Sequence, residues 1–317
     1  MRNFEKLTSE KVKKKAIELG ADLVGVCSAK VINENPPDPS WPQTVDRLWQ
    51  ECRTVVAIAK RMPWGSVMQD KKISGTYPPN LVMARLDDIA LDISYYIENQ
   101  GGNACPVPQQ ITDTELKKGA YGALSLKHVA AEAGLGTLGL NTMLITPEFG
   151  PRVYLTAVLT DLELECDVPL SKSQCLGPAC GRCLMSCPGD AVEHWALNKR
   201  KCSENAQRFG VGSLMGFLSK VISEPSLEKR QSLLFSSDFV NYWQAIRTGY
   251  QTVAGCLSCW KACPVGEDYP SHLKDKYTNL QDIPDSRQEK RKSMVLRDGS
   301  GESKGSFEHS RRWIGLK

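Results

Sequence analysis

The first half of the chain alternates between two hydrophobic patterns, one typical of helices and the other typical of buried strands. Apolar residues recur at helical spacing at Val12, Ala16 and Leu19, and Gly20 ends the stretch. The same spacing returns over residues 86–97. Short apolar or β-branched runs predict strands instead, at residues 21–26, 54–59, 104–108, 142–146 and 153–160. The chain up to about residue 165 therefore combines helices with strands.

The second half of the chain is richer in cysteine. Most cysteines lie within residues 166–270, and apolar residues at helical spacing occupy positions 214–222 between them. Beyond residue 281 the chain is first basic and then rich in glycine and serine, which predicts a solvated extension. We therefore divide the chain into residues 1–165, a cysteine-rich domain of residues 166–270 and a basic C-terminal extension of residues 271–317.

Composition and charge exclude several classes of protein. The 317 residues are 41% hydrophobic and 24% charged, as in ordinary soluble domains. The net charge of +4 is too small to indicate nucleic acid or a membrane surface. No apolar run is long enough to span a membrane, and no apolar signal core follows Met1. We expect a cytoplasmic protein with no membrane span and no nucleic-acid partner.

Two cysteine runs share the pattern C-x2-C-x3-C-P. The first is Cys180-Gly-Arg-Cys183-Leu-Met-Ser-Cys187-Pro188, and the second is Cys256-Leu-Ser-Cys259-Trp-Lys-Ala-Cys263-Pro264. This pattern ends the ferredoxin runs that bind [4Fe–4S] clusters. Two cysteines separated by two residues can bind neighbouring irons of one cube, whereas the cysteine before proline ligates the other cube in two-cluster ferredoxins.

Two cubes require eight thiolates. With Cys175 the two runs supply seven, and Cys202, in Lys-Arg-Lys-Cys202-Ser, is the natural eighth. A zinc site would need only four ligands and does not explain the third cysteine and proline of each run. A disulfide framework belongs to small secreted chains. The sequence therefore predicts two [4Fe–4S] clusters.

A glycine motif points to a different cofactor, and we reject that interpretation. Gly134, Gly136 and Gly139 match G-x-G-x-x-G, and Asp161 follows at about the spacing of a dinucleotide site. That site needs a strand before the glycines and a helix after them. Here the order is reversed, because a helical segment at 125–133 precedes and a strand-like segment at 142–146 follows. The glycines still predict a tight turn or a close approach to something, such as a flat cofactor.

Several segments together resemble one known superfamily. They are His128-Val-Ala-Ala-Glu-Ala-Gly-Leu-Gly136, Leu138-Gly-Leu-Asn141, Leu144-Ile-Thr-Pro-Glu-Phe-Gly-Pro-Arg152 and Ala157-Val-Leu-Thr-Asp161, followed by the two cysteine runs. In this order they resemble the cobalamin-dependent epoxyqueuosine reductases and reductive dehalogenases. The resemblance covers residues 16–266. It implies an α/β, nitroreductase-like domain that holds a base-off cobalamin, with an appended ferredoxin-like domain.

The resemblance also implies which residues hold the cofactors. One cluster would be bound by Cys175, Cys180, Cys183 and Cys263, and the other by Cys187, Cys202, Cys256 and Cys259. Four residues separate Cys175 from Cys180, where many relatives have two, so Cys166 is kept as an alternative to Cys175. The residues expected against the corrin ring are His128, Gly134, Gly136, Thr137, Gly139, Asn141 and Thr142.

Catalytic roles are implied in the same way, with one departure. Epoxyqueuosine reductases have an acidic proton donor where this chain has Ala120. Tyr121 is adjacent, and reductive dehalogenases use a tyrosine as acid, so we expect Tyr121 to donate the proton. Lys127 and Arg152, with His128, are candidates for lowering the pKa of this phenol or for holding an anionic substrate group.

The expected function is a cobalamin-dependent iron–sulfur oxidoreductase resembling reductive dehalogenases. It would pass electrons through two [4Fe–4S] clusters to cobalamin and remove a leaving group from a small organic substrate. A low-potential donor such as ferredoxin or flavodoxin would supply the electrons. Three alternatives remain: an epoxyqueuosine reductase-type enzyme of tRNA modification, a ferredoxin-like electron-transfer protein, and a protein that reactivates another protein's corrinoid.

Overall fold

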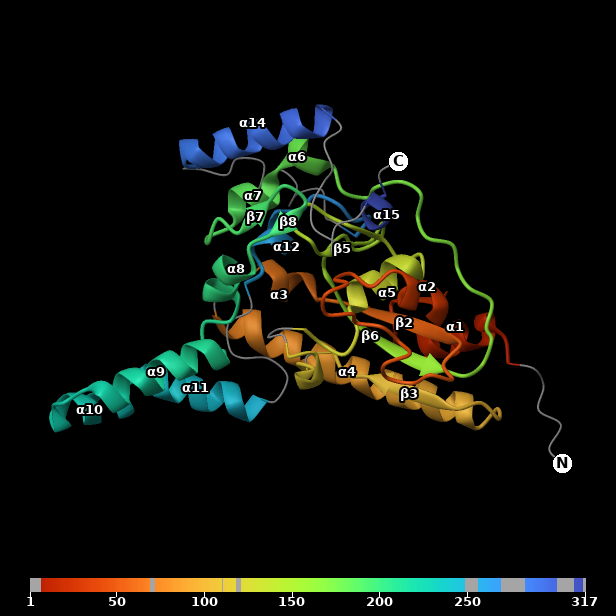
Figure 1. Ribbon diagram of the computed structural model, residues 1–317, viewed down its shortest axis with the longest axis horizontal. Coiled ribbons are helices and arrows are strands. Elements are labelled where there is room, and N and C mark those ends of the chain that lie inside the picture. Colours follow the sequence, from red (N-terminus) through yellow and green to blue (C-terminus); the bar gives the residue numbers. More distant parts are fainter. Residues whose placement is uncertain are drawn as a thin grey trace.

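A four-stranded antiparallel sheet lies at the centre of the molecule (Figure 1). The computed structural model describes residues 7–68, 72–109, 111–117, 121–248, 256–268, 283–300 and 311–315. The strands follow the order β1-β2-β6-β3 and comprise Leu23–Ser28, Thr54–Arg61, Val153–Thr160 and Ala104–Val107 respectively. The strands predicted near residues 54, 104 and 153 are confirmed, and the first strand begins two residues later than expected.

Helices cover both faces of this sheet, which explains the unbroken apolar runs of its strands. In β2, Val56 and Ile58 pack on one side with helices α1 (Ser9–Glu18) and α4 (Lys72–Glu98). Val55, Ala57 and Ala59 pack on the other side, where α2 (Ala29–Glu34) and α5 (Leu126–Glu132) lie. Because successive strand residues point to opposite faces, a strand covered on both faces must be apolar throughout.

Short elements surround the cysteine motifs. Two small hairpins comprise β4 (Thr137–Leu138) with β5 (Leu144–Ile145), and β7 (Val192–Glu193) with β8 (Ala196–Leu197). The motifs themselves form α6 (Gly177–Cys180), α7 (Arg182–Ser186) and α12 (Ser258–Ala262). Trp64–Met68 forms α3, and Thr114–Leu116 forms a single 3-10 turn. Strand β5 is shorter than the strand predicted at 142–146.

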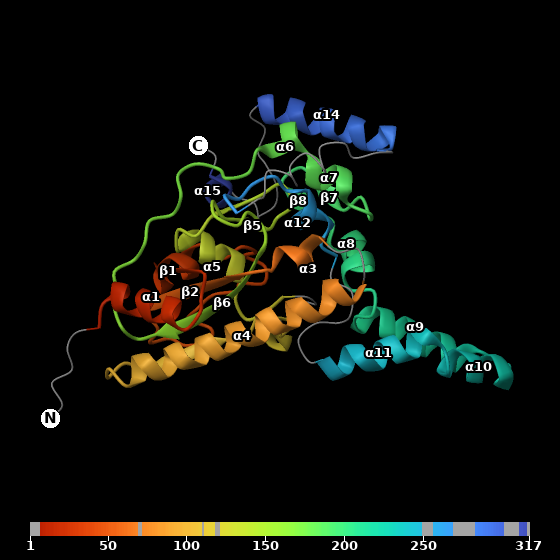
Figure 2. The same ribbon diagram turned by 180° about the vertical axis from the view of Figure 1, so that it is seen from behind.

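A helical arm is inserted between Cys202 and Cys256. It follows α8 (Lys199–Ala206) and contains α9 (Val211–Ser223), α10 (Leu227–Leu234) and α11 (Ser237–Thr248). Figures 1 and 2 show α9, α10 and α11 projecting from the rest of the molecule. The arm has its own small core, in which Phe209, Tyr242 and Ala245 are buried. The helix predicted at residues 214–222 is confirmed as α9.

The C-terminal extension is packed, so the prediction of a solvated tail is wrong for its described part. Helix α14 (Asp285–Gly299) lies along α6 and α7, and Arg287 Nη1 donates to the Met185 carbonyl oxygen at 2.8 Å. Helix α15 (Arg311–Ile314) buries Trp313 and Ile314. Basic composition misled the prediction because arginines can bind backbone carbonyls as well as face water.

Helix α15 is anchored on a buried carboxylate of α5. Glu132, only 3% exposed, accepts hydrogen bonds from Arg312 Nε and Nη2 and from Trp313 Nε1. The Trp313 ring also lies edge-on to His128, with ring centroids 4.4 Å apart. A buried carboxylate needs such partners, and this requirement holds the end of the chain against the first domain. No helix among the described residues is long and apolar enough to cross a membrane.

Candidate functional site

Four cysteines line one open pocket beside the first motif. Gly181 takes up a left-handed backbone conformation, with φ of +57°, between α6 and α7. This turn brings Cys180 and Cys183 to one side of the pocket, and Cys175 and Cys263 complete its thiol lining. We call this group of Cys175, Cys180, Cys183 and Cys263 the first cluster site.

Burial and mutual repulsion affect the thiols of the first cluster site. Burial raises the pKa of Cys183 well above its ordinary value, and the neighbouring thiols Cys175, Cys259, Cys263 and Cys180 raise it further. Burial likewise raises the pKa of Cys263 to about 12. Thiols this close together oppose one another's ionisation. They can all be thiolates together only with cations between them, as in an iron–sulfur cluster.

The other four cysteines of the motifs form a second group, Cys187, Cys202, Cys256 and Cys259, which we call the second cluster site. Burial raises the pKa of Cys259 to about 12, with further contributions from Cys256, Cys202 and Cys187 and then from Cys263 of the first cluster site. The pKa of Cys202 is raised by burial and then by Cys256 and Cys187. Cys183 and Cys187 come from one motif yet lie in different groups, so the two motifs cross.

The arrangement of the thiols fits cubes better than single ions. Within the described parts of the chain, no three cysteine, histidine or carboxylate side chains lie close enough together to bind one metal ion. In a four-iron cube each thiolate binds a different iron, so the ligands stand farther apart than those of one zinc ion. All twelve cysteines are free thiols, so none forms a disulfide. Four thiols around an open pocket therefore fit a [4Fe–4S] cluster.

Cys166, the alternative to Cys175, lies elsewhere. Its side chain is exposed and donates to the Leu164 carbonyl oxygen at 3.7 Å. The pKa of Cys166 is raised by burial and then by the carboxylates Asp167 and Glu163. The pKa of Cys175, in contrast, is raised by burial and by the neighbouring thiol of Cys180. The geometry therefore places Cys175 in the first cluster site.

The glycines of the 134–142 loop pack against the chain itself. A Cβ on Gly136 would lie 2.3 Å from the Ile145 carbonyl oxygen, and one on Gly139 would lie 2.7 Å from the Ile145 side chain. Gly134 has φ of +76°, and its Cβ would lie 2.7 Å from the Val168 carbonyl oxygen. The close approach that the glycines predicted is therefore to the chain's own backbone and side chains.

The polar residues expected against the corrin ring also have protein partners. Thr137 Oγ1 accepts from the Gln174 backbone N–H at 2.9 Å, and the His128 ring nitrogen Nδ1 pairs with Ser125 Oγ at 2.6 Å. Thr142, with φ of +62°, has its carbonyl oxygen bound by Lys127 Nζ at 3.2 Å. Asn141 is the residue of this set that lines the pocket of the first cluster site.

The loop also touches the first cluster site directly. The Leu140 backbone N–H donates to Cys175 Sγ at 3.4 Å, and the Gly177 N–H donates to the same sulfur at 3.4 Å. The segment that sequence analysis assigned to a corrin ring is therefore in contact with a cysteine of the first cluster site. A cofactor held by this loop would neighbour that site.

The three predicted catalytic residues have partners on different elements. Tyr121 is buried, and its hydroxyl donates to Asp38 Oδ2 at 2.9 Å. Lys127 donates to Thr142, as described above. Arg152 is 1% exposed and donates to the Val265 carbonyl oxygen at 3.0 Å and to Asp268 Oδ1 at 2.8 Å. Arg152 thereby holds the segment that follows Cys263. Ala120 lies outside the described residues.

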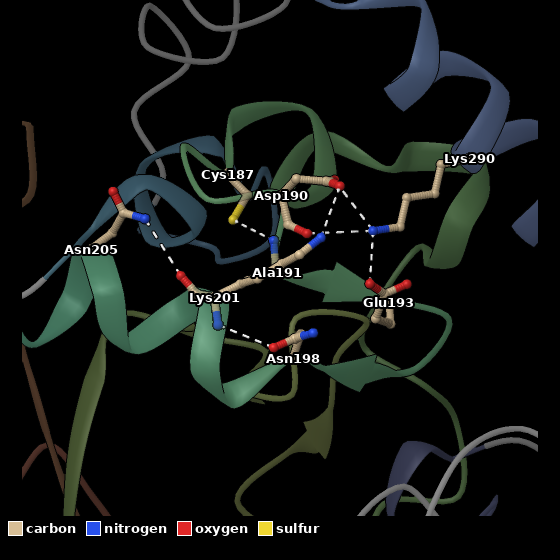
Figure 3. A network of polar contacts seen from close by, with 8 residues as sticks. All are labelled: Cys187, Asp190, Ala191, Glu193, Asn198, Lys201, Asn205 and Lys290. Atoms are coloured by element: carbon tan, nitrogen blue, oxygen red, sulfur yellow. Dashed lines mark hydrogen bonds and ion pairs between the residues drawn. The ribbon is translucent and has the colours of Figure 1, made fainter. Parts of the chain in front are cut away.

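Sequence reasoning missed one residue of the site. Arg182 lines the pocket of the first cluster site, and its Nη1 is a buried atom without a hydrogen-bond partner in the protein. Its position between Cys180 and Cys183 was the available signal, because a residue inside a C-x2-C turn must lie near the bound group. Figure 3 shows a contact at the second cluster site, where the Ala191 N–H donates to Cys187 Sγ at 3.3 Å.

Fold and site together define a mixed α/β protein with two crossed ferredoxin-type cysteine motifs. The chain matches no protein-family model. An epoxyqueuosine reductase of Atelocyanobacterium thalassa is 31% identical over 163 residues, which are 51% of this chain and 42% of the relative. A tetrachloroethene reductive dehalogenase of Dehalobacter restrictus is 29% identical over 223 residues, covering 59% of this chain and 38% of the relative. The matches thus span about two fifths of these relatives.

A solved structure has a similar fold. The catabolic reductive dehalogenase NpRdhA, in complex with 3-bromo-4-hydroxybenzoic acid, matches 98% of this chain and 39% of its own, with a TM-score of 0.55 and 17% identity. At that identity the likeness concerns the fold alone. Both relatives by sequence bear names from the superfamily that contains the epoxyqueuosine reductases and the reductive dehalogenases, and this chain is similar to each over part of its length. Both are groups of reductases, so the chain is related to oxidoreductases.

Proposed function

We propose that this protein is an iron–sulfur oxidoreductase of the reductive dehalogenase type, with two [4Fe–4S] clusters and a base-off cobalamin. The observation that carries the proposal is the gathering of cysteines from both motifs around one pocket, where Cys180 and Cys183 of the first motif meet Cys263 of the second and Cys175. A disulfide framework does not fit these free thiols, and the C-x2-C-x3-C-P spacing of both motifs favours cubes over zinc.

The protein's own contribution is to bind and insulate the clusters. Helices α7 and α12 lie side by side and present cysteines to both cluster sites. Besides the cysteines, the pocket of the first cluster site is lined by apolar residues, among them Ile145, Pro264 and Val265, and by Asn141 and Arg182. Arg152 ties the segment after Cys263 to β6 and so fixes the position of that ligand.

The cobalamin is proposed from the relatives and from the resemblance, not from the glycines, whose Cβ positions the chain itself occupies. When bound, cobalamin supplies a strongly reducing cobalt centre for removal of a leaving group. The 134–142 loop, which borders Cys175, is the segment proposed to hold it. A low-potential one-electron donor such as ferredoxin or flavodoxin would reduce the clusters.

Tyr121 is the proposed proton donor for a small organic substrate. Breaking a carbon–leaving-group bond with two electrons leaves a carbanion that takes up one proton. Tyr121 has one phenolic proton, which its hydroxyl donates to Asp38 in this structure, so transfer to the carbanion requires the O–H bond to rotate away from Asp38. That hydrogen bond fixes the position of the phenol oxygen before any substrate binds.

A second candidate function is reduction of epoxyqueuosine in tRNA, because the 31%-identical relative carries that name. The two candidates share the clusters and differ in substrate and proton donor. Turnover of brominated phenols against turnover of an epoxyqueuosine-containing tRNA stem loop separates them.

Anaerobic purification followed by metal and corrinoid analysis tests the shared part of the proposal. We expect about eight irons and eight sulfides per chain, and one corrinoid after reconstitution with excess cobalamin. Stoichiometric zinc with little iron would overturn the cluster assignment. Full iron content without corrinoid binding would contradict the dehalogenase proposal and would favour an electron-transfer protein instead.

A further inference from the structure

Arg182 places a positive charge at the first cluster site. Its side chain lines the pocket that is bounded by the four cysteines, and Nη1 is buried without a hydrogen-bond partner in the protein. A buried guanidinium nitrogen left unbonded costs free energy. A [4Fe–4S] cluster with four thiolates is an anion whose sulfurs accept hydrogen bonds, so the bound cluster would provide the missing partner.

Backbone N–H groups add to the same effect. Cys175 Sγ accepts from Leu140 N and from Gly177 N, each at 3.4 Å. Both hydrogen bonds favour a negatively charged sulfur. Reduction adds a further negative charge to a cluster, so donors and cations around it favour the reduced state.

The carboxylate beside the first cluster site already has hydrogen-bond partners in the protein. Asp298 lies beside the first cluster site, with Oδ2 3.6 Å from where a Cβ on Gly177 would stand. Asp298 Oδ1 accepts from Trp195 Nε1 at 3.0 Å and pairs with His194 Nε2 at 2.7 Å. Arg152 also faces this site, because its Nη1 donates to the Cys263 carbonyl oxygen at 3.5 Å, although Asp268 offsets part of its charge.

The second cluster site has fewer such groups among the described residues. Cys187 Sγ accepts from the Ala191 N–H, and Cys256 Sγ donates to Ser258 Oγ at 3.4 Å. The nearest basic side chains in Figure 3 are already paired with carboxylates, because Lys201 Nζ lies 3.7 Å from Asp190 and Lys290 Nζ lies 2.9 Å from Glu193.

We propose that Arg182, with the Leu140 and Gly177 N–H groups, makes the first cluster the one of higher reduction potential. Electrons then move in one direction. With both clusters bound, a low-potential one-electron donor would reduce the second, and the second would in turn reduce the first, without proton transfer. The first cluster borders the 134–142 loop, so the electron stops next to the proposed cofactor. This inference rests on the proposed function.

Anaerobic redox titration of the full reconstituted chain, followed by electron paramagnetic resonance, tests the inference. The signal that survives in Cys187→Ala identifies the first cluster. In the wild type we expect that signal at the higher potential. Arg182→Gln should lower the equilibrium constant for its reduction about tenfold, which is about 59 mV for one electron, and leave the second cluster unchanged. Arg182→Lys keeps the charge and should retain most of the wild-type potential.

Lys201→Gln is the matched control, because it removes an exposed, ion-paired charge directly beside Cys202. It should shift neither potential. A higher potential for the second cluster, or no shift of the first in Arg182→Gln, would overturn the inference and leave the proposed function standing. If Arg182→Gln fails to hold the first cluster, Arg182→Lys provides the test. A wild-type reduction potential in Arg182→Lys supports the inference. A reduction potential about 59 mV lower in that variant contradicts it, because the charge is still present. Absence of both clusters from the wild type would instead overturn the proposed function.

Discussion

Arg152 and Arg182 flank the same group of thiols, yet their guanidinium groups have different surroundings. Arg152 is bound by Val265 and Asp268 and stacks on Trp64, with its guanidinium carbon 4.2 Å from the ring centroid. Arg182 lines the pocket of the first cluster site from inside the first motif. Arg152 therefore positions a ligand segment, whereas Arg182 borders the space between the thiols.

The crossed ligation can be tested at a single cysteine. Cys187→Ala should abolish the cluster at the second site, because Cys187 is grouped with Cys202, Cys256 and Cys259. Iron content should fall from about eight to about four per chain, and one paramagnetic signal should disappear. Cys183→Ala is the matched variant four positions earlier in the same motif and should remove the other signal. Loss of the same signal in both variants would contradict the crossing.

A second prediction concerns Tyr121. If Tyr121 donates the proton, Tyr121→Phe should lower turnover about a hundredfold to ten-thousandfold while iron content is unchanged. If the hydroxyl only supports the fold through Asp38, the variant should lose stability, by about 1.5–3 kcal/mol for a hydrogen bond to a charged group, and keep its turnover. Tyr242→Phe is the matched control, because Tyr242 is buried in the arm and bonded to Ser213 Oγ at 2.9 Å. Turnover and chemical denaturation of both variants distinguish the two roles.

At the scale of elements, the hairpin β4–β5 links the loop to the first cluster site. Gly136 and Gly139 allow the loop to lie directly on Ile145, and the same loop presents the Leu140 N–H to Cys175. Helix α15 then closes over α5 through Glu132. The 134–142 loop, the hairpin β4–β5 and helix α15 therefore pack together on the side of the molecule where the loop contacts Cys175.

Substitution in this loop should lower the stability of the fold, and any loss of cofactor should accompany that loss of stability. In Gly136→Val the Cβ would lie 2.3 Å from the Ile145 carbonyl oxygen, and overpacking of this kind costs roughly 1–3 kcal/mol. We expect a lower unfolding midpoint together with partial loss of iron from the first cluster site. Gly216→Ala in α9, where a Cβ meets nothing within 4 Å, should instead stabilise by about 0.5–1 kcal/mol. A normal midpoint with selective loss of corrinoid would show that the loop's role is cofactor contact alone.

At the scale of the whole molecule, the twelve cysteines divide into three environments. Eight belong to the two cluster sites. Cys27 and Cys52 are buried in the core, and Cys105 and Cys166 are exposed. Burial raises the pKa of Cys52 to about 11 and raises that of Cys27 as well. Only the thiolate reacts with alkylating agents, so the core thiols become reactive only as the pH rises toward these raised values.

Alkylation at pH 8 should therefore label Cys105 first and Cys166 next in the native, cluster-loaded protein. Removal of iron by a chelator should expose the eight cluster cysteines, and denaturation should then expose Cys27 and Cys52. Peptide mass spectrometry after each step measures the order. Rapid labelling of Cys256 or Cys180 before chelation would contradict their assignment as cluster ligands.

The sequence by itself determined the features that depend on residues close together along the chain. The apolar run at the start of β2 predicted a buried strand, and the C-x2-C-x3-C-P spacing predicted cluster ligands, because turn geometry and side-chain alternation are local properties. The resemblance added the order of these segments, which the relatives share.

Only the tertiary structure decided which distant residues meet. It placed Cys175 rather than Cys166 beside Cys180, and it showed that Gly136 makes room for Ile145 rather than for a ligand. It also packed Trp313 on His128 at the end of a segment that composition alone described as solvated. Spacing and composition carry no information on such contacts, because each depends on how separate elements pack and on which buried polar groups need partners.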